Sequence, residues 1–333
     1  MLVDLHTHST YSDGRYTPAE LVQTAVSKNI RVLVLTDHDS WNGYAAAAME
    51  AERLNNRYLE LLATGLQPQA AFAGLQAELA SLVAVAESKS TQGNIPAVLP
   101  IQDPVLPCGE EPLLKVFCGL ELSTMYKNKS VHVLGYHVSR SCAALQAKME
   151  EMRGKRQWRL NAILAKVRAL GMDVQISPCD SSLRSVGRPH VAKAMVAKGY
   201  VGSVQEAFDK YLRRGGPCYV EQPKLTPAEA VELIHLAGGL AVLAHPSEIK
   251  QTDIVEELLQ TIPFDGLEVW HPSALESNEV DKWLSMAAQH QLLTSGGSDF
   301  HGIPDRYPDR LGIWQVAYSK TQAVIEYTNK LSE

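Results

Sequence analysis

Residues 3–39 read VDLHTHSTYSDGRYTPAELVQTAVSKNIRVLVLTDHD and contain one complete unit of strand, helix and strand. The apolar runs at 2–5 and 30–35 are typical of strands that are buried on both faces. Between them, Thr17, Pro18 and Glu20 have the spacing of a capping box that starts a helix. Both strands run directly into histidine and aspartate side chains, which core packing alone does not require.

The same unit recurs in the C-terminal half of the chain. Thr226, Pro227 and Glu229 form a second predicted capping box, and further helices are predicted near 43–62, 252–261 and 275–290. The other predicted strands are short apolar runs at 115–123, 130–138, 240–246, 265–272 and 292–302. Strands that alternate with helices indicate a mostly parallel sheet with covered faces. The predicted fold is therefore α/β, with a (β/α) barrel as the first choice and an open doubly wound sheet as the second.

Two segments interrupt this alternation. Residues 63–113 are rich in Ala, Leu and Gln and then in Pro, which predicts a helix near 68–88 followed by a loop, and we interpret them as a surface insertion. Residues 141–217 are mostly helical in pattern and indicate a separate helical subdomain. The predicted barrel consists of residues 1–140 and 218–333.

Composition limits the class of partner. The net charge of −6 over 333 residues provides no global positive field for gripping a long nucleic-acid duplex, so a small anionic substrate would need a local positive site. Five cysteines without a CxxC pair favour reduced thiols and a cytoplasmic location. We expect neither a signal peptide nor a membrane span, because polar residues interrupt the first strand and no run of about 18 apolar residues occurs.

Side chains with metal-binding chemistry stand at nearly every predicted strand end. They are His6, His8 and Asp13 after the first strand, Asp37, His38 and Asp39 after the second, Glu121 and His132 on the next two, and His245, His271, Asp299 and His301 on the last three. A single histidine beside a strand is usually an ordinary core or surface residue. A barrel would bring all of these side chains to one mouth, so the joint pattern predicts a metal site.

The donor set narrows the metal chemistry. His6 and His8 are two positions apart on a strand, so their rings share a face, and the same spacing relates Asp299 to His301. Imidazole nitrogens and carboxylate oxygens without cysteine suit zinc, manganese or iron, and Glu121 is placed to bridge two ions. Because a catalytic zinc takes three protein ligands, this many candidates predicts two or three divalent ions. Their charge exceeds that of the nearby carboxylates, which fits a substrate that bears phosphate.

These motifs resemble those of one known family. DLHTHSTYSDG, TDHD, GLELS with the following His132, AHP and SDFH are similar, in this order, to the motifs of the polymerase and histidinol phosphatase (PHP) superfamily. The resemblance implies a distorted (β/α)7 TIM-like barrel with an inserted helical subdomain and a trinuclear metal centre. The implied ligand sets are His6, His8, Glu121 and Asp299 for one ion, Glu121, His132 and His245 for a second, and Asp13, His38 and His301 for a third. Asp37 and Asp39 are expected to orient the imidazoles from behind.

The helical segment narrows the resemblance further. Residues 187–220, GRPHVAKAMVAKGYVGSVQEAFDKYLRRGGPCYV, are similar to a segment of bacterial nucleoside 3′,5′-bisphosphate phosphatases, some of which also trim short RNA from the 5′ end. This similarity implies that the subdomain lies over the metal mouth. It makes Arg188 and His190 the candidates for gripping a second phosphate, with a weaker claim for Arg214.

The expected reaction is hydrolysis of the 3′-phosphate of a nucleoside bisphosphate. A hydroxide bridging two metal ions would attack phosphorus, so no covalent nucleophile from the protein is required. Ser9, Ser12 and Ser298 suit turn or supporting roles, and His271 is a candidate for contacting substrate or protonating the leaving group. Two alternatives stay open: a phosphatase of another small monoester, such as histidinol phosphate, and a non-catalytic metal-binding module. The sequence does not fix the oligomeric state.

Overall fold

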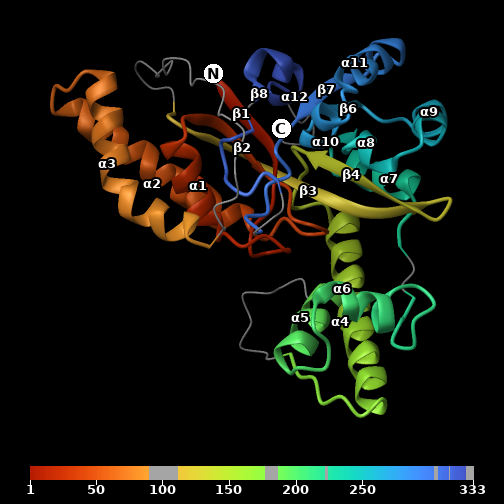
Figure 1. Cartoon of the computed structure of the whole chain (residues 1–333). Coiled ribbons are helices and arrows are strands. Elements are labelled where there is room, and N and C mark those ends of the chain that lie inside the picture. The colour runs from red at the N-terminus through yellow and green to blue at the C-terminus, as the bar shows by residue number, and fades with distance from the viewer. Residues whose placement is uncertain (90–111, 177–186, 222–223, 304–306, 315, 328–333) are drawn as a thin grey trace.

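The computed structural model describes residues 1–89, 112–176, 187–221, 224–303, 307–314 and 316–327. Within these residues seven strands lie side by side in chain order, and an eighth of two residues pairs with the other side of the first. The strands are β1 (Leu2–Thr7), β2 (Ile30–Leu35), β3 (Lys115–Tyr126), β4 (Lys129–Tyr136), β5 (Leu240–Leu243), β6 (Gly266–Trp270), β7 (Leu293–Gly296) and β8 (Val316–Ala317). The sheet curves into a nearly closed barrel, joined where Thr7 pairs with Phe300 just beyond β7 (Figure 1). The predicted distorted barrel is confirmed.

The distortion comes from a hairpin in the middle of the sheet. β4 is antiparallel to both β3 and β5, whereas the pairs β1–β2, β2–β3, β5–β6 and β6–β7 are parallel. Because β4 runs in the opposite direction, its N-terminal half lies at the end of the barrel where its neighbours have their C-terminal ends. His132 can therefore stand within a strand and still face the same mouth as residues that follow other strands.

Helices cover the outside of the barrel on two sides (Figure 1). The helices are α1 (Pro18–Ser27), α2 (Tyr44–Ala63), α3 (Pro68–Glu87), α4 (Ala143–Ala169), α5 (Arg188–Ala197), α6 (Val204–Ala207), the π-helical turn η1 (Phe208–Leu212), α7 (Pro227–Leu236), α8 (Pro246–Ile249), α9 (Thr252–Thr261), α10 (Pro272–Glu276), α11 (Val280–Gln289), the 3-10 turn η2 (Tyr318–Lys320) and α12 (Gln322–Ile325). Both predicted capping boxes are confirmed: Thr17 pairs with Glu20 at the start of α1, and Thr226 with Glu229 at the start of α7. Each cap contributes about 1 kcal/mol to helix stability.

The described part of the 63–113 insertion is helix α3. By length and composition α3 could cross a membrane, with a mean hydropathy of 1.3. Phe72, Leu75 and Leu79 are buried in a cluster shared with α1 and α2, however, and core helices of soluble proteins pass the same test. The predicted helix near 68–88 is confirmed, whereas the predicted loop that follows lies mostly outside the described residues, as do Cys108 and Cys179.

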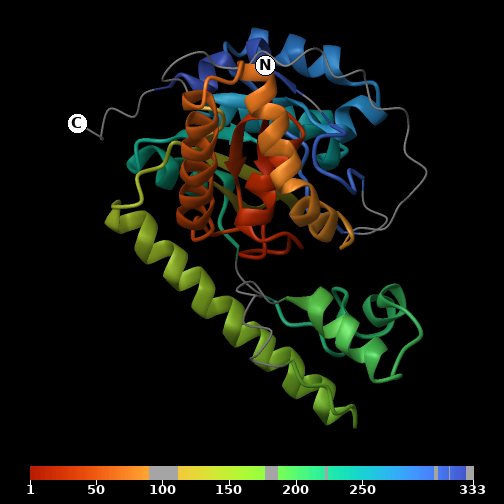
Figure 2. The same ribbon diagram turned by 90° about the vertical axis from the view of Figure 1, so that its left-hand side faces the viewer.

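Helix α4 joins the barrel to the helical subdomain. Its first turns bury Leu145, Met149 and Met152 in the core cluster of β3–β6, so this half of the helix belongs to the barrel. Its second half buries Leu160 and other residues in a separate cluster with α5, α6 and the segment up to Val220. Figure 2 shows α4 leaving the barrel as a long straight rod with the short helices beside its far half. The second half of α4 and the short helices therefore share a hydrophobic core of their own, which begins near Leu160, while the predicted domain boundaries at 141 and 217 stay a prediction.

Candidate metal centre

The mouth of the barrel gathers side chains from all seven main strands or from the loops after them. We call this group the mouth cluster; it comprises His6, His8, Asp13, His38, Glu121, His132, His245, His271, Asp299 and His301. His6 and His8 share one face at the end of β1, as their spacing predicted, with ring centroids 5.2 Å apart. The structure thus brings together all nine residues that were predicted as metal ligands, together with His271.

Glu121 lies at the centre of the mouth cluster and is 1% exposed. Its Oε1 lies 2.6 Å from His132 Nδ1 and 3.1 Å from His245 Nε2. The nitrogens around its other oxygen, Oε2, are His38 Nδ1 at 2.9 Å, His8 Nε2 at 3.2 Å and His6 Nε2 at 3.4 Å. Because the two oxygens face different imidazoles, one carboxylate can serve two cations, as the prediction of a bridging role requires.

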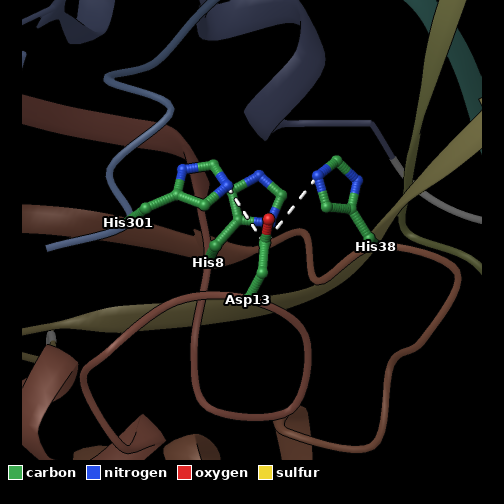
Figure 3. A group of neighbouring side chains, drawn as sticks. All are labelled: His8, Asp13, His38 and His301. Carbon is green, nitrogen blue, oxygen red and sulfur yellow. Dashed lines mark ion pairs between the residues drawn. The ribbon is translucent and has the colours of Figure 1, made fainter. Parts of the chain in front are cut away.

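Two aspartates flank Glu121. Asp299 Oδ1 lies 3.0 Å from His8 Nε2 and 3.3 Å from His6 Nε2. Asp13 faces a different set of rings, with His301 Nε2 at 3.1 Å, His38 Nε2 at 3.8 Å and His8 Nδ1 at 3.9 Å (Figure 3). Asp13 is therefore carried by its loop to a second side of His8, away from Asp299.

These contacts define groups whose ligand atoms lie within 4.8 Å of one another. The groups are His6, His8, Glu121 and Asp299; His8, Asp13, His38 and His301; His38, Glu121 and His132; and Glu248, His271 and Asp299. The first matches the first implied ligand set, and the second contains the third implied set with His8 added. The remaining implied set differs, because His38 rather than His245 joins Glu121 and His132, although His245 still contacts Glu121. Glu248 was not predicted.

Unpartnered polar atoms give an independent test of whether cations fit this site. Buried atoms without a hydrogen-bond partner among the described residues include His6 Nε2, His8 Nε2, Asp13 Oδ1, His38 Nδ1, Glu121 Oε2, His245 Nδ1 and His301 Nε2. Buried polar atoms normally have hydrogen-bond partners, and a convergent set of nitrogens and oxygens without them suits a bound ion or water. The donor set therefore fits divalent metal ions.

The backbone is bent sharply where it delivers these side chains. His245, Asp299 and Asp39 have φ of 25°, 51° and 49°, in the left-handed region that costs a residue other than glycine about 1–3 kcal/mol. Gly297 permits the approach of the strand end to β1, because a Cβ there would lie 2.4 Å from the backbone nitrogen of His6. The fold holds strained conformations at this mouth, as functional sites often do.

The charges of the mouth cluster depend strongly on one another. Burial opposes the charge of His6, but Glu268, Asp299 and Glu121 raise its pKa well above the usual value. Burial likewise opposes the charge of Asp299, while His301 and His6 hold its pKa well below the usual value. Without metal the carboxylates thus retain protons on several imidazoles. Cations that bind here would take the place of those protons.

The predicted supporting residues have partly different contacts from those expected. Asp37 accepts hydrogen bonds from the hydroxyls of Ser9 (2.7 Å) and Ser12 (2.6 Å), and Ser12 Oγ lies 3.4 Å from His8 Nδ1. Asp37 therefore acts on an imidazole through a serine. Asp39 accepts from the Ser123 backbone N–H at 2.8 Å and forms an ion pair with Arg156, so it ties the loop to β3 and α4 instead of orienting a ring.

Sequence reasoning missed two carboxylates beneath the mouth cluster, Asp4 and Glu268, both 0% exposed. Asp4 accepts hydrogen bonds from the backbone and hydroxyl of Ser298, and burial raises its pKa to about 7 despite these bonds. Glu268 contacts His6 Nδ1 at 2.9 Å. Each stands inside an otherwise apolar strand, where a buried carboxylate without a partner would be energetically costly. Their positions in the sequence could therefore have indicated buried carboxylates that have specific partners.

The predicted substrate residues lie outside the mouth cluster, at the subdomain. Arg188 begins α5 and lines a cavity between α4, α5 and the barrel. His190 Nδ1 accepts the Gly187 backbone N–H at 3.1 Å, so this ring caps α5. Arg214 pairs with Asn128 and Glu221 on the exposed surface. Contact of these residues with phosphate stays a prediction.

Comparison with known proteins agrees with this geometry. Residues 4–134 match the PHP domain family. The chain is 28% identical to a 3′,5′-nucleoside bisphosphate phosphatase of Chromobacterium violaceum, over 90% of this chain and 87% of that one. It is 27% identical to the 5′-3′ exoribonuclease Rnm of Salmonella typhimurium, over 90% of this chain and 85% of that one. An amidohydrolase structure from Chromobacterium violaceum with bound sulfate has a TM-score of 0.64 at 26% identity, over 95% of this chain and 91% of that one. Fold, site and relatives together support a metal-dependent phosphoesterase whose residues 4–134 match the PHP domain.

Proposed function

We propose that this phosphoesterase removes the 3′-phosphate of nucleoside 3′,5′-bisphosphates, with short 5′-phosphorylated RNA as a further substrate. The observation that carries the proposal is a cationic cavity beside the mouth cluster. This cavity has a volume of about 380 Å³ and is lined by Arg156, Arg159, Arg188 and other cations. A site for one phosphate at the metals and a site for a second phosphate nearby match a doubly phosphorylated substrate.

The cavity holds more positive than negative charge. Its cationic side chains are Lys148, Lys155, Arg156, Arg159, Arg188 and Lys224, and its carboxylates are Asp39 and Glu229. Partial burial and the charges of Arg156 and Arg188 lower the pKa of Lys224 to about 8, as expected where like charges are held together. An anion bound in this cavity would relieve that repulsion.

Hydrogen bonds link the cavity to the mouth cluster. Lys224 Nζ donates to Ser130 Oγ at 3.3 Å, and Ser130 Oγ lies 3.3 Å from His132 Nε2. On another side, the Asp39–Arg156 ion pair connects the residue after His38 with α4. The two sites are therefore separated by single side chains, a spacing that suits two phosphates on one nucleotide.

Two or three divalent ions, of manganese, iron or zinc, would be held by the nine predicted ligands of the mouth cluster. Bound ions of this kind lower the pKa of water and stabilise charge on phosphoryl oxygens. The chain's own part is to hold these groups in a buried site and to keep Glu121 between the two halves of the cluster.

His271 has the geometry of a hydrogen-bond donor to the substrate. Its Nδ1 accepts the Ser273 backbone N–H at 3.1 Å, so in the neutral ring the proton is on Nε2. Nε2 points into the mouth cluster, 3.8 Å from Asp299 Oδ2. In this orientation the ring would donate a hydrogen bond to a phosphoryl or leaving oxygen, which is the predicted substrate contact. The other predicted role, protonating the leaving group, would require the imidazolium form of the ring.

The same observations separate this proposal from its alternatives. A small monoester such as histidinol phosphate gives the cationic cavity no partner. A non-catalytic metal-binding module would need the donors of the mouth cluster, but it would not need a cationic cavity beside them. Relatives named as 5′-3′ exoribonucleases support short RNA, whose second phosphate would occupy the same cavity.

A substrate panel with metal-loaded protein tests the proposal. We expect nucleoside 3′,5′-bisphosphates to be cleaved with the highest kcat/KM, releasing the 3′-phosphate, and short 5′-phosphorylated RNA to be shortened from its 5′ end. Nucleoside 3′-monophosphates serve as matched controls, because they differ from the bisphosphates only in lacking the 5′-phosphate. A preference for histidinol phosphate over every nucleotide would overturn the proposed substrate.

A further inference from the structure

Glu268 lies in the middle of β6, beneath the mouth cluster, and its two oxygens have different partners. Oε1 lies 2.9 Å from His6 Nδ1, at the end of β1. Oε2 accepts the His245 backbone N–H at 2.8 Å, just beyond β5. One fully buried carboxylate thus joins two candidate ligands that are 239 positions apart in the sequence, as their numbers in the chain show.

The contact with His6 decides which ring nitrogen faces the cations. A carboxylate at Nδ1 keeps the proton there and leaves the lone pair on Nε2. That Nε2 lies 3.3 Å from Asp299 Oδ1 and 3.4 Å from Glu121 Oε2, within the first ligand group. Glu268 therefore sets both the tautomer and the direction of the His6 ring.

The contact with His245 acts through the backbone. His245 has φ 25° and ψ 64°, an unfavourable conformation that needs support from its surroundings. Its N–H is fixed by Glu268, and its ring then places Nε2 3.1 Å from Glu121 Oε1. The rings of His6 and His245 stack at 5.8 Å with an interplanar angle of 22°, so the two ligands lie side by side above the same carboxylate.

We propose that Glu268 is a positioning residue that couples two neighbouring metal positions of this centre. His6 serves the position on the Oε2 side of Glu121, and His245 serves the position on the Oε1 side. Because one carboxylate orients a ligand of each, losing it weakens both positions together. This inference rests on the metal centre of the proposed function and does not depend on which phosphoester is cleaved.

Glu268→Gln is the sharpest test, because the amide keeps the size of the side chain. One of its two ends is an NH₂ group, which cannot accept a hydrogen bond from His6 or from the His245 backbone. We expect metal affinity, measured by competition with a chromophoric chelator, to fall about 10–100-fold, as for other residues that orient metal ligands. The visible spectrum of the Co²⁺-substituted protein should also change, since it reports the arrangement of the ligands.

Asp265→Asn is the matched control. Asp265 Oδ2 likewise contacts one imidazole, His235 Nε2 at 2.7 Å, and accepts one backbone N–H, that of Ala241 at 2.7 Å, but it lies at the ends of β5 and β6 away from the mouth cluster. Asp265→Asn should lower the unfolding temperature and leave the Co²⁺ spectrum unchanged. Equal effects of both substitutions on the spectrum, or no effect of Glu268→Gln on metal affinity, would overturn the positioning role.

Two further measurements keep the outcome unambiguous. If Glu268→Gln does not fold, Glu268→Asp retains the charge but is one methylene too short to reach both partners, so it should weaken metal binding in the same direction. Unaltered metal affinity in that variant would contradict the proposal. Wild-type protein that binds divalent ions but cleaves no phosphoester would refute only the proposed function, whereas wild-type protein that binds none would refute both.

Discussion

The mouth cluster and the cationic cavity are adjacent, but they are built in opposite ways. In the mouth cluster, buried side chains from distant strands contact one another, and Glu121 alone touches five imidazoles. In the cavity, neighbouring cations bond to different groups: Arg159 donates to the Val220 carbonyl, Arg188 donates to the Leu212 carbonyl, and Arg156 pairs with Asp39. A network of mutual contacts fails as a unit, whereas cations with different partners can be removed one at a time. A single substitution in the mouth cluster should therefore abolish catalysis, whereas a single substitution in the cavity should weaken substrate binding only in part.

The largest effect is expected for Glu121→Gln. The amide cannot carry the charge that faces five imidazoles, and the bridging role between the two halves of the mouth cluster is lost. Transition-state stabilisation by metal ions is several kcal/mol, so we expect kcat to fall by about 10³-fold or more. Kinetics and elemental analysis of the same preparation measure this. A Glu121→Gln protein with full metal content and nearly normal kcat would contradict the claim that the mouth cluster fails as a unit.

Metal removal should change the pH dependence of stability in a way specific to the mouth cluster. Burial opposes the charge of the rings, but Glu121 and Asp13 raise the pKa of His38 to about 9, and Glu121 and Glu248 raise that of His245 to about 9. A raised folded-state pKa stabilises the fold below the unfolded value near 6.5, and this contribution is lost as pH rises through 9. The metal-free protein should therefore lose stability between about pH 6.5 and 9.

The metal-loaded protein should behave differently over the same range. Ions compete with protons for the imidazoles, so metal binding strengthens as pH rises and offsets the loss. Thermal unfolding at several pH values, with Mn²⁺ and after chelation, compares the two forms. Parallel pH profiles would show that the ions do not replace these protons.

The difference between the two sites also explains what the sequence could predict. His6, His8 and Asp299 stand at the ends of apolar strands, and strand ends in a barrel converge whatever the details of packing. The antiparallel β4 was not foreseen, because parallel and antiparallel strands share the same apolar pattern, yet His132 was found from its histidine chemistry. Candidate ligands at the mouth could thus be predicted from their residue types together with their positions at or near strand ends.

Contacts that depend on tertiary register could not be predicted in this way. Asp39 was expected behind an imidazole, but a left-handed backbone turns it toward Ser123 and Arg156. In the sequence, Glu268 looks like an ordinary strand residue. Its contacts with His6 and with the His245 backbone become evident only when the position of β6 in the sheet is known. The cavity cations Arg156 and Arg159 lie on one long helix, whose sequence does not show which turn faces the barrel.

Substitutions in the cavity should have intermediate effects. Arg159→Ala and Arg188→Ala each remove a charged donor, and hydrogen bonds to charged groups contribute about 1.5–3 kcal/mol, or about 10–100-fold in KM. This loss should apply to nucleoside 3′,5′-bisphosphates and not to 3′-monophosphates. Arg168→Ala is the matched control, since Arg168 is an exposed α4 cation outside the cavity lining. Equal losses on both substrates would place the second phosphate elsewhere.

The smallest effect is expected for His190→Ala, which tests a residue that was predicted to grip phosphate. His190 Nδ1 accepts the Gly187 N–H at the start of α5, so its removal should cost about 1 kcal/mol of stability, as other N-terminal caps do. Because the ring is absent from the cavity lining, KM for a bisphosphate should change less than about 3-fold, well below the effect of a lost charged hydrogen bond. Urea unfolding and steady-state kinetics on the same protein separate the two quantities. A large rise in KM for bisphosphates with unchanged stability would contradict this expectation. It would show that His190 contacts the substrate and that the binding site reaches as far as His190 on α5.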